Sequence, residues 1–216
     1  MSISQKEDHK YLIKVIQKIV SLVSITTAVI LVSLLNVYTL PKNFHLQCFE
    51  YLQTRLIQWE SFKNSNCSVM LKYPNFWEYE LQDQFWGPFV AVFSNPNEFN
   101  TKVSVSLETL TKLMSLEDYA DSKEKEIKIH SKNSKILERK YTTISNRKAV
   151  KITYTYINSN RNRTSIKREV IVTLYEKKAY LLSFEAKIEK FSESYFIFKN
   201  IKRSFQISSN FCKKKR

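Results

Sequence analysis

The 216-residue chain carries 35 Lys and Arg residues against 20 Asp and Glu residues, a formal net charge of +15 at pH 7. Hydrophobic residues make up 43% and aromatic residues 13%, which excludes an intrinsically disordered chain. The single glycine, Gly87, excludes glycine-rich phosphate loops, dinucleotide-binding fingerprints and nucleophile elbows, because these need glycine where backbone approaches a ligand or adopts a positive φ.

The cysteines and histidines are too scattered to predict a metal site or a catalytic pair. Cys48 and Cys67 could form a disulfide in an oxidising compartment. Together with Cys212 they are more simply interpreted as three separate thiols, and the sequence leaves the pairing open.

An uncharged apolar run extends from Ile19 to Leu40. About 20 helical residues cross a bilayer core of ~30 Å, so the run predicts one transmembrane helix after a short tail of residues 1–18. The run is longer than the usual apolar region of a signal peptide and is followed by bulky residues, which favours an uncleaved anchor over a cleaved signal.

The flanking charges predict the orientation of this anchor. Lysines precede it at positions 6, 10, 14 and 18, whereas only Lys42 and Arg55 follow at comparable distance. The positive-inside rule then predicts an N-terminus on the cytoplasmic or stromal side and a translocated domain. Translocation puts nucleic acid out of reach, so the positive charge of the domain predicts an acidic partner, either a protein surface or lipid headgroups.

Residues 41–67 are predicted to form an amphipathic connector. Its apolar residues recur at steps of three and four, which is typical of a helix that lies either at the membrane surface or against the domain: Cys48, Phe49, Leu52, Leu56 and Trp59. The polar stretch Lys63-Asn64-Ser65-Asn66 predicts the boundary of the domain.

From Ser68 the hydrophobic period changes to two residues, as in β-strands. The predicted strands are Val69–Tyr73, Trp77–Leu81, Phe89–Phe93 and Lys102–Leu107. Trp77, Phe85 and Trp86 are interpreted as packing residues rather than a ligand slot.

A helix is predicted from Ser115 to about Ile129, because Ser115-Leu116-Glu117-Asp118 resembles a capping box. Glu117, Asp121 and Glu124 form a row along it. Lys125 and Lys128 follow Asp121 and Glu124 by one helical turn, which indicates an ion-paired, solvated face rather than a calcium site.

Four further strands and a final helix are predicted: Ile136–Tyr141, Ala149–Ile157, Ile166–Tyr175, Ala179–Ala186 and a helix near Lys190–Ile201. Short polar links between these strands predict an antiparallel meander. Helices that cover an antiparallel sheet give an α+β sandwich over residues 68–207, followed by a basic tail of residues 208–216.

Several short stretches resemble landmarks of the PsbP-like domain family of cyanobacteria and chloroplasts. The likeness opens with Lys72-Tyr73-Pro74-Asn75-Phe76-Trp77 and continues in the family's order with Lys102–Val105, Ser115–Tyr119, Lys178–Tyr180 and Ile201–Phe205. Each stretch alone is a common packing pattern, and their order and spacing carry the resemblance over about residues 68–207.

The resemblance implies an α/β/α sandwich without catalytic activity. PsbP is an extrinsic subunit on the lumenal side of photosystem II, where it helps the oxygen-evolving centre to retain calcium and chloride. The resemblance therefore implies a thylakoid-lumen or periplasmic domain, acidic photosystem II subunits as partners, no covalently bound cofactor, and calcium as a ligand. PsbP is soluble whereas this chain is predicted to be tethered, so a role in photosystem assembly is equally expected.

The candidate docking residues are basic, since lysine and especially arginine bind carboxylates. One patch comprises Arg161, Arg163, Lys167 and Arg168. A second, on the preceding hairpin, comprises Arg139, Lys140, Arg147 and Lys148. Solvated hairpins in a lysine-rich chain are the alternative interpretation.

Three functional hypotheses follow. The first is a membrane-tethered, non-catalytic PsbP-like module associated with photosystem II. The second is an envelope interaction or assembly protein of the same fold, unrelated to photosystem II. The third is an enzyme, for which the sequence shows no nucleophile and base pair.

Overall fold

The computed structural model describes residues 57–64, 68–82, 89–98, 100–131, 133–158 and 163–207. The predicted tail and anchor (residues 1–40), most of the connector, Arg161, Phe85, Trp86 and the basic tail lie outside these ranges. Within the described ranges, no helix has both the length and the apolar composition needed to cross a bilayer.

A seven-stranded antiparallel sheet forms the centre of the domain, in the order β3-β4-β5-β9-β8-β7-β6. Its strands are β3 (Glu78–Gln82), β4 (Phe89–Ser94), β5 (Lys102–Thr109), β6 (Lys135–Ile144), β7 (Arg147–Asn158), β8 (Thr164–Tyr175) and β9 (Lys178–Lys187). Strands β3 to β5 and β6 to β9 are two meanders, which β5 and β9 join by pairing with each other. The predicted antiparallel meander is thus confirmed.

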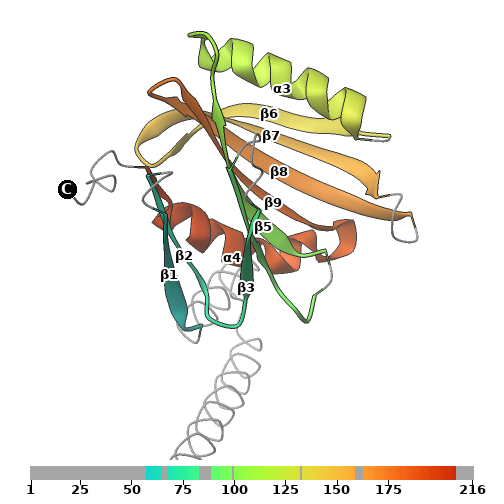
Figure 1. Cartoon of the computed structure of the whole chain (residues 1–216). Coiled ribbons are helices and arrows are strands. Elements are labelled where there is room, and N and C mark those ends of the chain that lie inside the picture. The colour runs from blue at the N-terminus through green and yellow to red at the C-terminus, as the bar shows by residue number, and fades with distance from the viewer. Residues whose placement is uncertain are drawn as a thin grey trace, which may run out of the picture. The chain divides into compact units, whose positions relative to one another are not determined.

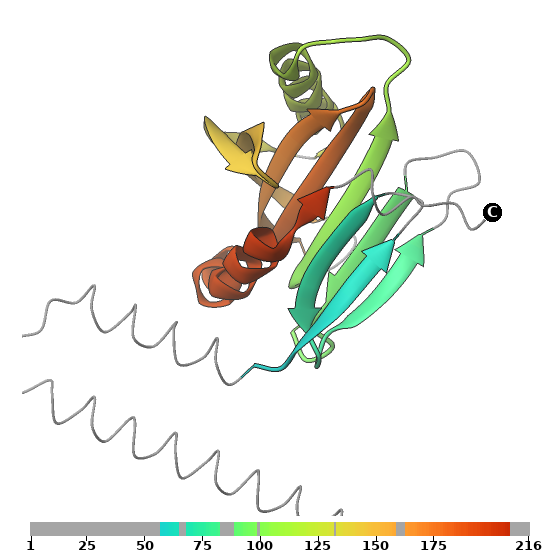
Figure 2. The same cartoon turned by 90° about the vertical axis from the view of Figure 1, so that its left-hand side faces the viewer.

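A second, three-stranded sheet contains β1 (Trp59–Asn64), β2 (Val69–Pro74) and β10 (Gln206–Ile207), with β2 in the middle. In Figure 2, β10 in red lies beside the blue-green strands of this sheet. The helix prediction is wrong for residues 59–62, because β1 begins at Trp59. Phe62 is buried opposite Leu71 while its neighbours Ser61 and Lys63 are exposed, so pairing with β2 overrides the helical spacing.

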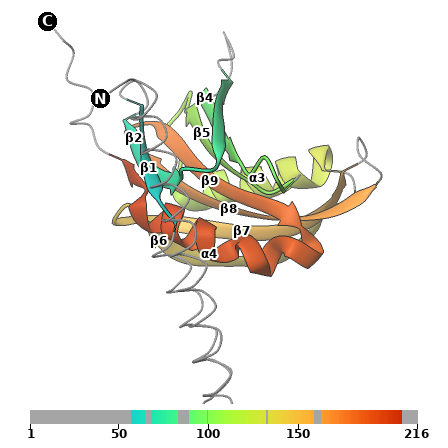
Figure 3. The ribbon, with the colours of Figure 1, turned by 90° about the horizontal axis from the view of Figure 1, so that it is seen from below.

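The two helices lie on opposite sides of the seven-stranded sheet, as Figures 1 and 3 show. Helix α4 (Ile188–Ser204) and the small sheet cover one face and bury the larger apolar cluster. Helix α3 (Leu116–His130) packs Tyr119, Ala120 and Ile127 over β7 and β8 on the other face. As predicted, Ser115 caps α3, since its hydroxyl accepts a hydrogen bond of 3.0 Å from the amide of Asp118.

Two hairpin turns use non-glycine residues in the left-handed region. Ser145 and Asn146 link β6 to β7 with φ of 51° and 58°, and Glu176 and Lys177 link β8 to β9 with φ of 49° and 55°. Such two-residue turns normally favour glycine, because a side chain at positive φ crowds the backbone.

Replacing Lys177 by glycine is expected to stabilise the domain by about 1 kcal/mol, because it relieves the positive φ. The substitution keeps the hydrogen bond of 2.8 Å that the Leu110 amide donates to the backbone carbonyl of residue 177. Urea unfolding measures the change. The matched control is Lys178→Gly in the extended strand β9, which should lose stability instead; equal effects of the two substitutions would contradict the explanation.

Candidate functional site

The structure places the predicted basic residues at two ends of the sheet. Lys167 pairs with Thr155 on β7, whereas Arg147 starts that strand, so the two positions are about 26 Å apart at ~3.3 Å per residue. Arg163 is exposed at the same end as Lys167. The two patches therefore lie at opposite ends of the sheet.

At one end, the turns of two hairpins gather four basic residues, which we call the basic rim: Arg147, Lys148, Lys177 and Lys178. The guanidinium carbon of Arg147 lies 3.8 Å from the centroid of the Tyr175 ring. The hydroxyl of Thr173 donates to the carbonyl of Lys148 at 2.8 Å, which fixes the two hairpins together. Within the described ranges, no rim side chain forms a salt bridge with a carboxylate.

Neighbouring residues of the other patch face opposite sides of β8. The ammonium of Lys167 lies 4.6 Å from the ring centroid of Phe191 on α4. Arg168 lies on the α3 side, where its Nη2 donates to the hydroxyl of Ser183 at 3.0 Å. The alternation of side chains along a strand thus separates Arg168 from Arg163 and Lys167.

The acidic row on α3 is ion-paired, with a different partner from the one predicted. Glu117, Asp121 and Glu124 all contact the guanidinium of Arg139 on β6. The sequence pattern indicated Lys125 and Lys128, which lie on the same helix. Arg139 therefore fastens α3 to the edge of the sheet and is not exposed as a docking residue.

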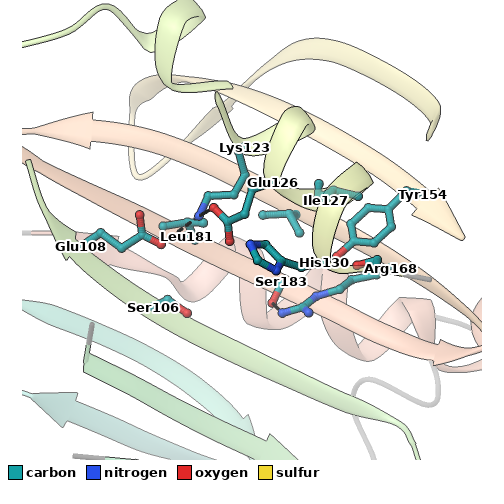
Figure 4. A pocket seen from close by; sticks show the side chains of 12 residues that line it. Ser106, Glu108, Lys123, Glu126, Ile127, His130, Tyr154, Arg168, Leu181 and Ser183 are labelled. Carbon is teal, nitrogen blue, oxygen red and sulfur yellow. Dashed lines mark hydrogen bonds and ion pairs between the residues drawn. The ribbon is translucent and has the colours of Figure 1, made fainter. Parts of the chain in front are cut away.

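A polar pocket of about 270 Å³ lies between α3 and the sheet, where the apolar packing of the helix ends (Figure 4). Strand β5 alternates Val103 and Val105 toward the α4 side with Ser104 and Ser106 toward the pocket. The polar side chains that line the pocket are Ser106, Glu108, Lys123, Glu126, His130, Ser131, Tyr154, Arg168 and Ser183.

One wall of the pocket is a closed charge network. The ammonium of Lys123 lies 2.9 Å from Glu108 and 2.7 Å from Glu126, and the hydroxyl of Tyr119 donates to Glu108. Burial, with the hydrogen bond to Glu108, raises the pKa of Tyr119 above its ordinary value. Tyr119 therefore stays a neutral donor, and both carboxylates have partners.

The opposite wall is built on β8 and β9. The hydroxyls of Ser104 and Ser183 are 2.6 Å apart and both residues are buried. Glu185 on the same face accepts from the hydroxyl of Tyr156 at 3.2 Å and lies 3.0 Å from the ammonium of Lys102. These polar groups therefore pair across different strands of the sheet.

The sequence predicts Arg168 as part of an exposed docking patch, but the structure places it in this pocket. The other polar residues of the pocket were not predicted as site residues. The scattered histidines of the sequence predict no site, but α3 places His130 at the pocket beside Arg168 (Figure 4). The alternation of Lys102, Ser104 and Ser106 with valines indicated a polar strand face. Only the burial of Ser104 and Ser183 distinguishes that face from a solvated one.

No protein-family model matches the sequence, and no curated protein matches it. Among solved structures, cyanobacterial PsbP (CyanoP) from Synechocystis sp. PCC 6803 matches with a TM-score of 0.53 and 13% sequence identity over 70% of this chain and 94% of that protein. LpqN from Mycobacterium tuberculosis, described as involved in cell envelope biogenesis, matches with a TM-score of 0.51 and 14% identity over 73% of this chain and 95% of LpqN. At these identities the likeness extends to the fold alone, and the fold of this chain is PsbP-like.

Proposed function

We propose that the chain is a non-catalytic binding module that docks electrostatically on an acidic protein surface. The observation that carries this proposal is the distribution of charge. Glu117, Asp121, Glu124 and Glu126 on α3, and Glu138 and Glu169 in the β6–β8 sheet, are engaged in internal ion pairs. The side chains of the basic rim have no such ion-pair partners within the described ranges. Their positive charges can therefore attract an acidic surface of another protein.

The pocket chemistry supports a binding role over a catalytic one. Glu108 and Glu126 are the carboxylates that line the pocket, and Lys123 and Tyr119 hold them in hydrogen bonds. A general base must be able to take a proton from a substrate, so carboxylates held in this way are poor candidates.

The specific partner that we propose is photosystem II, in stabilising or assembling the oxygen-evolving complex. Support comes from the resemblance over residues 68–207 and from the fold shared with cyanobacterial PsbP. In this proposal Ile19–Leu40 anchors the chain, with its N-terminus on the cytoplasmic or stromal side and the domain in the thylakoid lumen or periplasm.

Calcium binding has support from the resemblance alone. Among the described residues, no group of three or more His, Cys, Asp or Glu side chains could hold a metal ion. The acidic row on α3 is neutralised by Arg139, so it does not fit a calcium site. Docking as proposed here requires no ion.

A second candidate is an interaction or assembly role in a cell envelope. LpqN, which shares the fold, is described as involved in cell envelope biogenesis. The same basic rim would serve this role with a different acidic partner.

The test is a pull-down of the full-length tagged protein from solubilised native membranes at low and high salt. We expect photosystem II subunits at low salt and their loss at high salt, because exposed charges are screened. The double variant Lys148→Glu with Lys177→Glu should reduce recovery by about tenfold, because it reverses two charges of the rim. The matched control is Lys125→Glu with Lys128→Glu, at two exposed positions of α3. It has the same net charge as the rim variant and should bind as the unmodified protein does.

Recovery of an envelope complex instead would replace photosystem II by the second candidate. An equal loss in both double variants would contradict docking through the rim, and no partner at either salt would overturn the binding proposal.

A further inference from the structure

We propose that the pocket beneath α3 binds a small organic anion, and that Arg168, Ser183 and His130 hold its carboxylate or phosphate group. This site is separate from the basic rim and from the docking proposed above. The inference starts from Arg168, whose side chain lines the pocket while its Nε atom is buried without a hydrogen-bond partner within the described ranges.

The Nε atom of Arg168 is buried and has no hydrogen-bond partner within the described ranges. It lies 3.5 Å from Oε2 of Glu185, which makes an ion pair but not a hydrogen bond. A guanidinium has five N–H donors, and a buried donor without an acceptor is unfavourable. The side chain as a whole is 31% exposed and lines the pocket, so a ligand can reach it.

Glu185 is an incomplete counterion for Arg168. Its carboxylate is closer to Lys102, at 3.0 Å, and also accepts from Tyr156. One carboxylate beside the pocket therefore faces two cations, of which Arg168 lines the pocket. An additional anion at the exposed part of the guanidinium would balance the second positive charge.

The opposite wall selects the rest of the ligand. Lys123 already lies between Glu108 and Glu126, so it is not available to bind a second anion strongly. Two carboxylates around one ammonium leave oxygen lone pairs that can accept hydrogen bonds. The pocket thus fits a molecule with an anionic group at the Arg168 end and hydroxyl or amino donors at the other.

The dimensions and the lining favour a small ligand. The volume of about 270 Å³ is just below the ~300–1,000 Å³ typical of pockets for larger organic ligands. Ile127, Val170 and Leu181 form the apolar part of the lining, where a low local dielectric strengthens the contact with a guanidinium. His130 stands at the exposed end of α3 and projects toward Arg168 and Ser183, so it can add a third donor (Figure 4).

The experiment is an NMR titration of the full-length protein that follows the Nε–H resonance of Arg168. The probes are succinate and inorganic phosphate, each compared with sodium chloride at equal ionic strength. We expect the Arg168 signal to shift saturably with at least one probe and not with sodium chloride. A phosphate response alone assigns the site to phosphate compounds, and a succinate response alone assigns it to carboxylates.

Two variants separate the pocket from general charge effects. His130→Ala, at an exposed position, should weaken binding by about threefold to tenfold while leaving the fold unchanged. Lys128→Ala, also exposed on α3 but not lining the pocket, should bind as the unmodified protein does. Arg168→Lys keeps the charge and loses the planar fork, so it should weaken binding by roughly tenfold or more, followed through the backbone amide signals of Ser183 and His130 because the variant lacks the Arg168 Nε–H.

The proposal is overturned if neither probe shifts Arg168 beyond the effect of sodium chloride. It is also overturned if His130→Ala and Lys128→Ala weaken binding equally, because the anion would then be responding to surface charge. Neither outcome depends on whether the basic rim docks a protein.

Discussion

Replacing Phe184 by alanine is expected to destabilise the domain by about 4 kcal/mol, the middle of the range for a fully buried aromatic residue. Phe184 has no exposed surface and lies on β9, between β5 and β8 in the middle of the sheet. Its ring stacks on Phe198 of α4 at 5.2 Å between centroids and packs at a tilt of 51° against Phe191 at 4.9 Å. Removing the ring leaves a cavity between the sheet and α4 that neighbouring aromatic rings cannot fill without leaving their own contacts.

Urea unfolding of the full-length protein measures this loss as a change in the free energy of unfolding. Leu113→Ala is the control, because Leu113 is 77% exposed and its truncation should change stability by less than about 0.5 kcal/mol. A loss of under 1 kcal/mol for Phe184→Ala would mean that α4 does not depend on this aromatic cluster.

Replacing Glu169 by alanine is expected to cost about 3 kcal/mol, because it removes one member of a buried charge network. Glu169 is 2% exposed and faces α4. Both of its carboxylate oxygens accept from the hydroxyl of Tyr195, at 3.1 and 2.9 Å, and Oε2 lies 3.5 Å from the ammonium of Lys151. The substitution leaves that hydroxyl without its acceptor and Lys151 with Glu138 as its remaining ion-pair partner.

Glu169→Gln should cost less than Glu169→Ala, because the amide oxygen can still accept from Tyr195. Glu80→Ala removes an exposed carboxylate on β3 and serves as the control, with an expected change of less than about 0.5 kcal/mol. Equal stability of Glu169→Ala and the unmodified protein would show that the network is unnecessary for folding.

The two substitutions should not be additive. Glu169 and Phe184 are directly opposite each other on β8 and β9, and Tyr195 contacts both. For residues that share a partner in this way, the effect of the double substitution usually differs from the sum of the single effects by about 0.5–3 kcal/mol. A double variant measured in the same urea experiment gives the coupling.

Local sequence patterns correctly predicted the elements of the seven-stranded sheet. Alternation along β5 and β7 to β9, and the capping serine of α3, are properties of adjacent residues and need no tertiary contact. They failed at β1, where the apolar spacing before Trp59 is helical but residues 59–64 pair with β2. Hydrogen bonds to a partner strand determine whether such a segment forms a strand or a helix, and the sequence of the segment does not reveal that partner.

The same limit explains the candidate sites. Basic residues near one another in sequence suggested a single patch at Arg163, Lys167 and Arg168, but side chains alternate across a strand and Arg168 faces the pocket. The basic rim forms because two hairpin turns meet at one end of the sheet. Strand pairing brings these two turns together although they lie far apart in the sequence, so the sequence alone does not reveal the rim.

The sequence by itself determined the strands between Val69 and Ala186, the two helices, the excess of basic side chains, and the polar alternation of β5. Only the tertiary structure decided which charges are engaged and which remain exposed, because Arg139, Lys123 and Lys151 find their carboxylates on other elements. It also decided that Arg168 and His130 share a pocket. Ion pairs and pockets depend on distances across the sheet, which the chain sets only when the strands have paired.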